Sequence, residues 1–163
     1  MKKTILISLL LVVVLMFNGC FLFPSKMDIV DTAIENGNFT TLVTALTAAN
    51  LVETLRGTGP FTVFAPDDDA FAKVDSKTLS KLIANVPNLT KVLLFHVVSG
   101  EHLAADVVGM TKLASVEKSN LTVKVKGSTV QIENATIALT DIKCSNGVIH
   151  VIDSVMIPPT VAL

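Results

Sequence analysis

The spacing of hydrophobic residues changes from a helical period to a strand period along this sequence, and this change constrains the fold most. In the first half apolar residues recur three and four positions apart, which predicts helices over residues 28–37, 39–55, 76–86 and 89–97. In the second half they alternate with polar residues, which predicts strands over residues 121–126, 129–133, 134–142 and 146–155. Helices followed by a run of antiparallel strands indicate an α+β fold.

One strand is expected earlier, in FTVFAP at residues 61–66, and three aspartates follow it directly. Its alternation places Phe61, Val63 and Ala65 on one side. The aspartates Asp67–Asp69 have two interpretations. They could be ligands of a hard cation, which favours carboxylate oxygens, but neighbouring side chains at a helix start point about 100° apart and rarely converge on one ion. Capping of a helix N-terminus therefore explains them better.

The N-terminus has the order of an export signal. Lys2 and Lys3 precede an apolar run that begins at Ile5, and Asn-Gly-Cys follows it. Cys20 resembles the lipidated cysteine of a lipobox, whereas an uncleaved run to Phe23 is almost long enough to be a membrane anchor. Free secretion is the third alternative. The expected organisation is a signal at residues 1–20, a tether at 21–27, one domain at 28–159 and a tail at 160–163.

Charge and cysteine content narrow the class of protein. The formal net charge is −1, Arg56 is the single arginine, and the chain has neither Trp nor Tyr. These values disfavour a nucleic-acid partner, which requires a basic surface. The second cysteine, Cys144, is expected to be a buried or half-buried thiol if Cys20 is lipidated. Otherwise a disulfide between Cys20 and Cys144 remains open in an oxidising compartment.

Three stretches resemble the signature segments of the fasciclin-type domain. They are TVFAPDDDAF at residues 62–71, LLFHVVSG at 93–100 and NGVIHVIDSVMIPP at 146–159. The resemblance covers residues 28–159. It implies a β-wedge of antiparallel strands with a cluster of helices, in a secreted or surface-anchored protein. It further implies cell adhesion or matrix binding without a shared catalytic activity, so the expected partner is a surface or matrix protein or a glycan.

The family's structural motif is carried over residue by residue. The matching positions are Ala65, Pro66, Asp68, Ala70 and Phe71 in the first segment and Gly147, His150 and Asp153 in the last. Asp67 replaces the usual Thr, and both residue types can cap a helix. Some animal members use a Tyr-His pair in adhesion, and Phe95 and His96 occupy those positions. Other members use an Asp-Ile pair, which falls on Asp141 and Ile142.

The residues support no catalytic, cofactor-binding or metal site. The histidines His96, His102 and His150 lie in different segments and lack the paired spacing of metal ligands. His96 and His150 stand among apolar residues and are expected in the core. The chain also has no G-x-S-x-G nucleophile motif and no phosphate-binding loop.

Four N-x-S/T sequences are candidate glycosylation sites, at Asn38, Asn88, Asn120 and Asn134. All four lie at expected turns or element starts.

Together, the export signal, the resemblance and the lack of a catalytic motif lead to one main hypothesis. It is a non-enzymatic, membrane-anchored adhesion or partner-binding module that faces the cell exterior or periplasm. The alternative is an envelope protein that binds or hydrolyses a small ligand in a cleft near His96 and Asp141.

Overall fold

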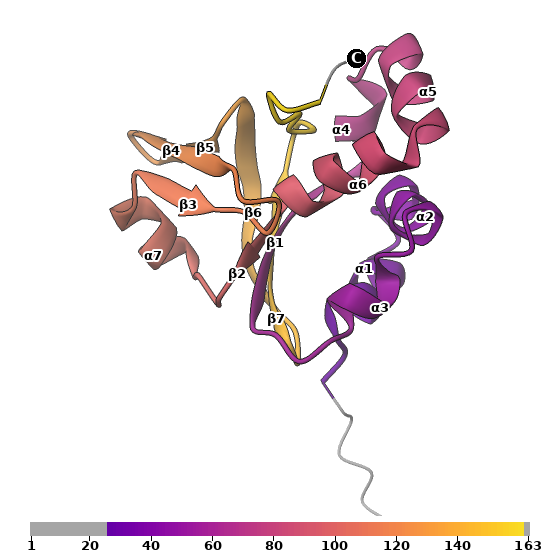
Figure 1. Ribbon diagram of the computed structural model, residues 1–163. Coiled ribbons are helices and arrows are strands. Elements are labelled where there is room, and N and C mark those ends of the chain that lie inside the picture. Colours follow the sequence, from indigo (N-terminus) through magenta and orange to yellow (C-terminus); the bar gives the residue numbers. More distant parts are fainter. Residues whose placement is uncertain (1–25, 162–163) are drawn as a thin grey trace, which may run out of the picture.

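The computed structural model describes residues 26–161, which form a cluster of helices beside a sheet (Figure 1). The helices are α1 (Ile29–Asn36), α2 (Thr40–Ala48), α3 (Val52–Leu55), α4 (Asp68–Ala72), α5 (Ser76–Ala84), α6 (Val86–Phe95) and α7 (Ala104–Gly109). The strands are β1 (Phe61–Pro66), β2 (Val97–Ser99), β3 (Lys112–Ala114), β4 (Asn120–Lys126), β5 (Thr129–Ile132), β6 (Ala135–Lys143) and β7 (Gly147–Ile152). The α+β prediction is confirmed.

The helices of the first half begin and end largely where local chemistry predicts. Asp28 caps α1 by accepting a hydrogen bond from the Asp31 N–H, and Gly37 ends it in the left-handed conformation at φ 77°. The single helix expected over residues 39–55 is wrong. Asn50 adopts a positive φ of 54° and divides that segment into α2 and α3. Asparagine tolerates this conformation better than most residues, so the break occurs there.

The seven strands form one sheet in the order β2-β1-β7-β6-β5-β4-β3. All neighbours pair antiparallel except β1 and β7, which pair in parallel along their whole lengths, from Phe61 opposite Gly147 to Pro66 opposite Ile152. The expected antiparallel wedge is therefore correct for all neighbouring strands except β1 and β7. Val98 of the edge strand β2 also forms an isolated bridge with Ser115, directly after the opposite edge strand β3, so the sheet curls towards closure.

Strand β1 separates two hydrophobic cores. Val63 and Ala65 pack with the helices α1 to α6, whereas Phe64 packs inside the curled sheet with residues such as Leu121 and Ile152. Both sides of β1 are buried, because Thr62 and Phe64, on the side opposite Val63 and Ala65, are both 0% exposed. A strand covered on both faces is typical of the middle of a layered fold.

The later strands confirm the predicted alternation, with additions that the pattern missed. Gly127 and Ser128 connect β4 to β5 as expected, and Leu121 and Val123 of β4 are buried, but Val125 is exposed. Helix α7 and the three-residue strands β2 and β3 were not predicted. Such short segments carry too few residues to establish a period.

Both ends of the described chain contact the domain. The Met27 carbonyl accepts a hydrogen bond from the Ser145 N–H, and Val161 is buried in the helical core. Among residues 26–161, no helix is long and apolar enough to cross a membrane. The expected signal, Cys20 and most of the tether lie outside the described residues.

Candidate functional site

The acidic run connects β1 to α4. Asp67 is the N-cap of α4, and its Oδ1 accepts a hydrogen bond of 2.7 Å from the Ala70 N–H. Asp69 is exposed in the first turn of the same helix. Within residues 26–161, no group of three or more His, Cys, Asp or Glu side chains lies where it could hold a metal ion. Asp67 therefore gives the run a helix-capping role.

Asp68 caps a different helix from the one that contains it. Its carboxylate accepts hydrogen bonds from the N–H groups of Thr40 and Thr41, at 3.2 and 2.8 Å, in the first turn of α2. Burial tends to raise the pKa of Asp68, but these hydrogen bonds outweigh burial and hold the pKa below its usual value. Phe39, the N-cap residue of α2, supplies no side-chain hydrogen bond. Asp68, which is far from α2 in sequence, therefore caps the N–H groups at the start of that helix.

The candidate adhesion pair Phe95 and His96 is buried. Both side chains are 2% exposed at the junction of α6 and β2. The Nδ1 of His96 lies 2.7 Å from the Val92 carbonyl, and its Nε2 accepts a hydrogen bond from the Met156 N–H. Desolvation lowers the pKa of His96 to about 4, although the hydrogen bond to Val92 acts in the opposite direction. The imidazole is thus a neutral structural group at pH 7.

The candidate pair Asp141 and Ile142 lies at a β-bulge in β6. Asp141 is exposed and has a positive φ of 59°, and its Oδ1 accepts a hydrogen bond of 2.9 Å from the Ala104 N–H at the start of α7. Ile142 is half-buried and packs against the helical core. Only Asp141 of the four candidate interaction residues therefore presents a largely accessible side chain.

A chain of hydrogen bonds fixes this bulge to the sheet. The Asp141 N–H donates to the Nδ1 of His150, which is fully buried and stacks on Phe64. The Nε2 of His150 lies 2.9 Å from the His102 carbonyl, and the His102 N–H donates to the hydroxyl of Thr62. His150 therefore links β7, the bulge and the loop before α7.

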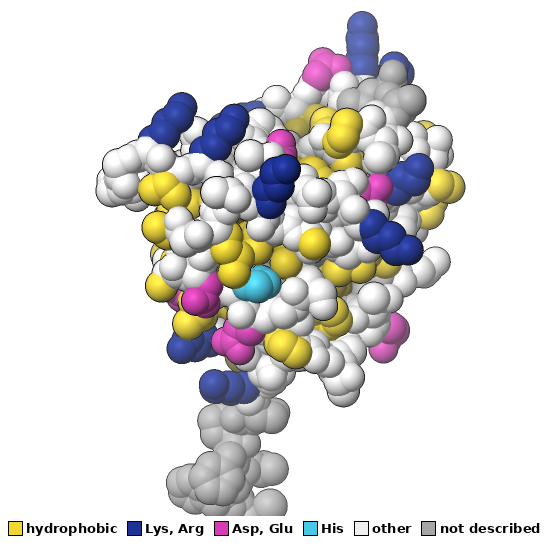
Figure 2. Space-filling model, turned by 60° about the vertical axis from the view of Figure 1, so that its left-hand side comes forward, with side chains coloured by type: hydrophobic (Ala, Val, Ile, Leu, Met, Phe, Trp, Pro, Cys, Tyr) yellow, Lys and Arg dark blue, Asp and Glu magenta, His cyan; other side chains and the backbone are white. Residues whose placement is uncertain are grey.

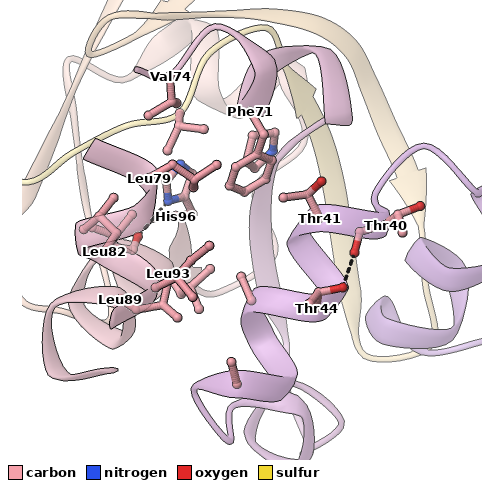
Figure 3. Close-up of a pocket in the computed structure, with 16 residues that line it drawn as sticks. Thr40, Thr41, Thr44, Phe71, Val74, Leu79, Leu82, Leu89, Leu93 and His96 are labelled. Carbon is pink, nitrogen blue, oxygen red and sulfur yellow. Dashed lines mark hydrogen bonds between the residues drawn. The ribbon is translucent and has the colours of Figure 1, made fainter. Parts of the chain in front are cut away.

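The cleft proposed between His96 and Asp141 does not form as one site. Their hydrogen bonds involve different partners, and Asp141 lines neither of the two pockets that His96 lines, the larger of which has sixteen lining residues. This larger pocket lies in the helical cluster, where labelled side chains such as Phe71 and Leu82 surround it (Figure 3). Its walls are almost wholly apolar, so it offers no acid–base pair for hydrolysis.

The remaining residues of the family motif are structural. Ala65 and Ala70 are 1% and 0% exposed, and Phe71 is buried against the helical core. Asp153 accepts a hydrogen bond from the Thr136 N–H through Oδ1, which joins the end of β7 to β6. Pro66 is the last residue of β1 and is buried.

The sequence pattern placed Asn146 only at the start of an expected strand and did not reveal its role. Its side chain accepts a hydrogen bond from the Ile29 N–H and donates to the carbonyls of Leu55 and Gly57. Next to it, a Cβ at Gly147 would lie 2.0 Å from the Phe61 carbonyl oxygen. Only glycine permits this close approach of β7 to β1, and an Asn-Gly dipeptide at a strand start is the signal that could have revealed it.

The candidate modification sites are mostly accessible. Asn38, Asn120 and Asn134 are exposed, whereas Asn88 is half-buried in the first turn of α6.

Cys144 is buried, and its thiol donates a hydrogen bond to the Thr32 hydroxyl. Burial, and then the charge of Asp28, raise the pKa of this thiol more than the Thr32 hydrogen bond lowers it.

Comparison with known proteins identifies relatives over most of the chain. The family model described as Fasciclin domain matches residues 37–158. An uncharacterized protein of Synechocystis sp. is 45% identical over 130 residues, which are 80% of this chain and 97% of that protein. The cell surface glycolipoprotein MPB83 of Mycobacterium bovis is 31% identical over 138 residues, which are 81% of this chain and 61% of that protein.

A solved structure shares the fold. It is the FAS1 domain pair from the insect cell adhesion molecule Fasciclin I, with a TM-score of 0.62 and 20% sequence identity. The match covers 77% of this chain and 47% of that one, so this chain spans about half of the domain pair.

Proposed function

Because this chain belongs to the fasciclin domain family, we propose that it is a non-enzymatic adhesion module that binds a surface or matrix protein or glycan outside the cytoplasm. The similarity to the domain pair of an insect cell adhesion molecule supports this proposal. The candidate catalytic cleft also lacks support, since His96 is buried and fully hydrogen-bonded. Adhesion requires an accessible contact surface instead.

The observation that carries the proposal is the exposed bulge of β6. Asp141 is held there in a left-handed conformation by His150 and α7, and Leu139 beside it is 54% exposed. An exposed apolar side chain next to a fixed carboxylate suits a contact with a partner. Because the carboxylate is already held in one position, binding loses less conformational entropy. Figure 2 shows hydrophobic side chains exposed between dispersed acidic and basic ones on one face of the molecule.

The proposal predicts that beads coated with the domain adhere to the surface of the cells that produce it. The double variant Leu139→Ser/Asp141→Asn should reduce the number of bound beads at least fivefold. Asn keeps an oxygen for the α7 cap and tolerates a positive φ, so the fold should persist. Bound beads are counted by microscopy, and circular dichroism verifies the fold.

A matched control distinguishes this surface from general effects of polarity. Ile34→Ser/Asp69→Asn removes an apolar side chain that is also 54% exposed and one exposed aspartate, both on the helical side. Beads carrying this variant should adhere as the wild type does. Equal losses for both variants would reject the β6 bulge as the contact surface, and absence of wild-type adhesion would reject the adhesive function.

The same proposal includes a membrane tether at Cys20. The support is the lipobox-like Asn-Gly-Cys after an apolar run, together with the similarity to a protein named a cell surface glycolipoprotein. A lipid on Cys20 would leave residues 21–27 as the tether between membrane and domain.

Cys20→Ala should therefore move most of the protein from the membrane fraction to the soluble fraction of lysed cells, as detected by immunoblotting. The substitution removes the thiol that a lipid would modify and changes the apolar run little. Cys144→Ala is the matched control and should leave the protein in the membrane fraction. Unchanged membrane association of Cys20→Ala would favour an uncleaved helix as the anchor.

A further inference from the structure

The helical cluster contains an apolar pocket that neither the family motif nor the proposed adhesion explains. It has a volume of about 220 Å³ and lies between α2, α4, α5 and α6 (Figure 3). Leu79, Leu82 and Leu93 from α5 and α6 lie on one side of it and Thr44 from α2 on the other. The pocket is therefore a space between helices and not a surface depression over the sheet.

The polar groups in the wall are already bonded within the protein. Both ring nitrogens of His96 have backbone partners, at Val92 and Met156. The Thr44 hydroxyl donates to the Thr40 carbonyl, and Thr41 bonds Asp68. No side chain among the sixteen lining residues carries a charge at pH 7. A ligand with a buried charge would consequently lose its hydration without gaining a partner.

The pocket also has a way in and small residues that keep it open. Ile83 and Ala48 line it and are exposed, with Ile83 at 52%, so the pocket reaches the surface without unfolding. Ala45 and Ala48 form part of the α2 wall, where a larger apolar residue would fill the space. The apolar side chains that line an empty pocket have no neighbouring atoms on that side and so lack dispersion attraction there. An apolar ligand in the pocket supplies these contacts.

From these observations we propose that the helical cluster binds a small, uncharged, apolar molecule in this pocket. Cavities of about 150 Å³ with similar linings stay dry and bind benzene. Scaled from the six carbon atoms of benzene in such a cavity, a pocket of 220 Å³ accommodates roughly nine carbon atoms. The ligand class is thus an alkyl-substituted aromatic or a hydrocarbon of that size.

The test uses n-propylbenzene as the probe and 3-phenylpropionate as its charged counterpart, in a titration of the 15N-labelled domain followed by NMR. Propylbenzene should shift amide signals of α2 and α6 with saturation at one site, and it should raise the melting temperature with increasing concentration. Phenylpropionate should bind at least tenfold more weakly. Equal affinity for the two probes would overturn the assignment of an uncharged ligand.

Variants connect the signal to the pocket. Ala48→Phe, at an exposed lining position that tolerates a larger side chain, should weaken propylbenzene binding at least tenfold, and Ala45→Phe serves as a second filling variant. Ala72→Phe, at an exposed position of α4 outside the lining, should bind as the wild type does. Dispersed NMR spectra verify that each variant is folded. Wild-type affinity in folded Ala48→Phe and Ala45→Phe, or no saturable shift in the wild type, would refute the proposal.

Discussion

Phe64→Ala is expected to lower the free energy of unfolding by about 3 to 5 kcal/mol. Phe64 is 0% exposed in the middle of β1 and fills the core inside the curled sheet. Its ring stacks on His150, with ring centroids 5.5 Å apart. Truncation would leave a cavity that the surrounding strands cannot close, because each is fixed by its neighbours in the ladder. Urea unfolding followed by circular dichroism measures the loss.

Val125→Ala is the matched control for this substitution. Val125 lies on β4 and is 44% exposed, so its truncation should change stability by less than about 0.5 kcal/mol. A loss of less than about 1 kcal/mol for Phe64→Ala would show that the inner core relaxes around the vacancy, contrary to the expectation of a tightly packed sheet.

Acidification is expected to destabilise the domain through His96. Its pKa is about 4 in the folded protein, against an ordinary value of 6.5. Between these values the unfolded chain binds more protons than the folded one, so the free energy of unfolding falls as the pH decreases through this window. The contribution of neutral His96 to the free energy of unfolding is fully present above pH 6.5 and lost by about pH 4. This loss of stability is on the order of 3 kcal/mol.

Comparison with His96→Gln isolates this contribution, because carboxylates such as Asp68, whose pKa is also lowered, add to acid destabilisation at lower pH. Denaturant unfolding at several pH values from 7 to 4 should give a shallower pH dependence for the variant than for the wild type. Parallel curves for the two proteins would mean that His96 becomes protonated without cost to the fold.

The sequence predicted the elements whose signals are local. Asp28 and Gly37 mark the ends of α1 because capping and left-handed residues act within one turn of the chain. The strands β4 to β7 were found because their alternation is long enough to establish a period. The signature segments also identified the family, since their order and spacing are specific.

The sequence could not show features that arise from distant contacts. Thr62 alternates with apolar residues like a solvent-facing position, yet it is buried because the Gly100 carbonyl and the His102 N–H satisfy its hydroxyl. Asp68 caps a helix that begins 28 positions earlier in the chain. No local pattern encodes either relation.

In the candidate site, too, the sequence revealed local features but not those that depend on distant contacts. Phe95 and His96 were proposed as contact residues by analogy, but the helix-to-strand junction at residue 96 directs both side chains into the protein. Asp141 is accessible, but its link to His150 and α7 depends on a bulge that alternation alone does not reveal. The apolar pocket left no sequence signal, because its lining residues have the pattern of ordinary core helices.

The parallel pairing of β1 with β7 has a consequence for how the polypeptide acquires its structure. Phe61 and Gly147 are partners although 86 positions separate them, so β1 gains its second neighbour only after residue 147 has been synthesised. Such non-local pairing slows folding relative to helical proteins of similar length. A nascent chain that ends before residue 147 lacks the strand next to β1, and its helices have no completed sheet to cover. Completion of the sheet around β1 is therefore a late step in folding, because it requires β7.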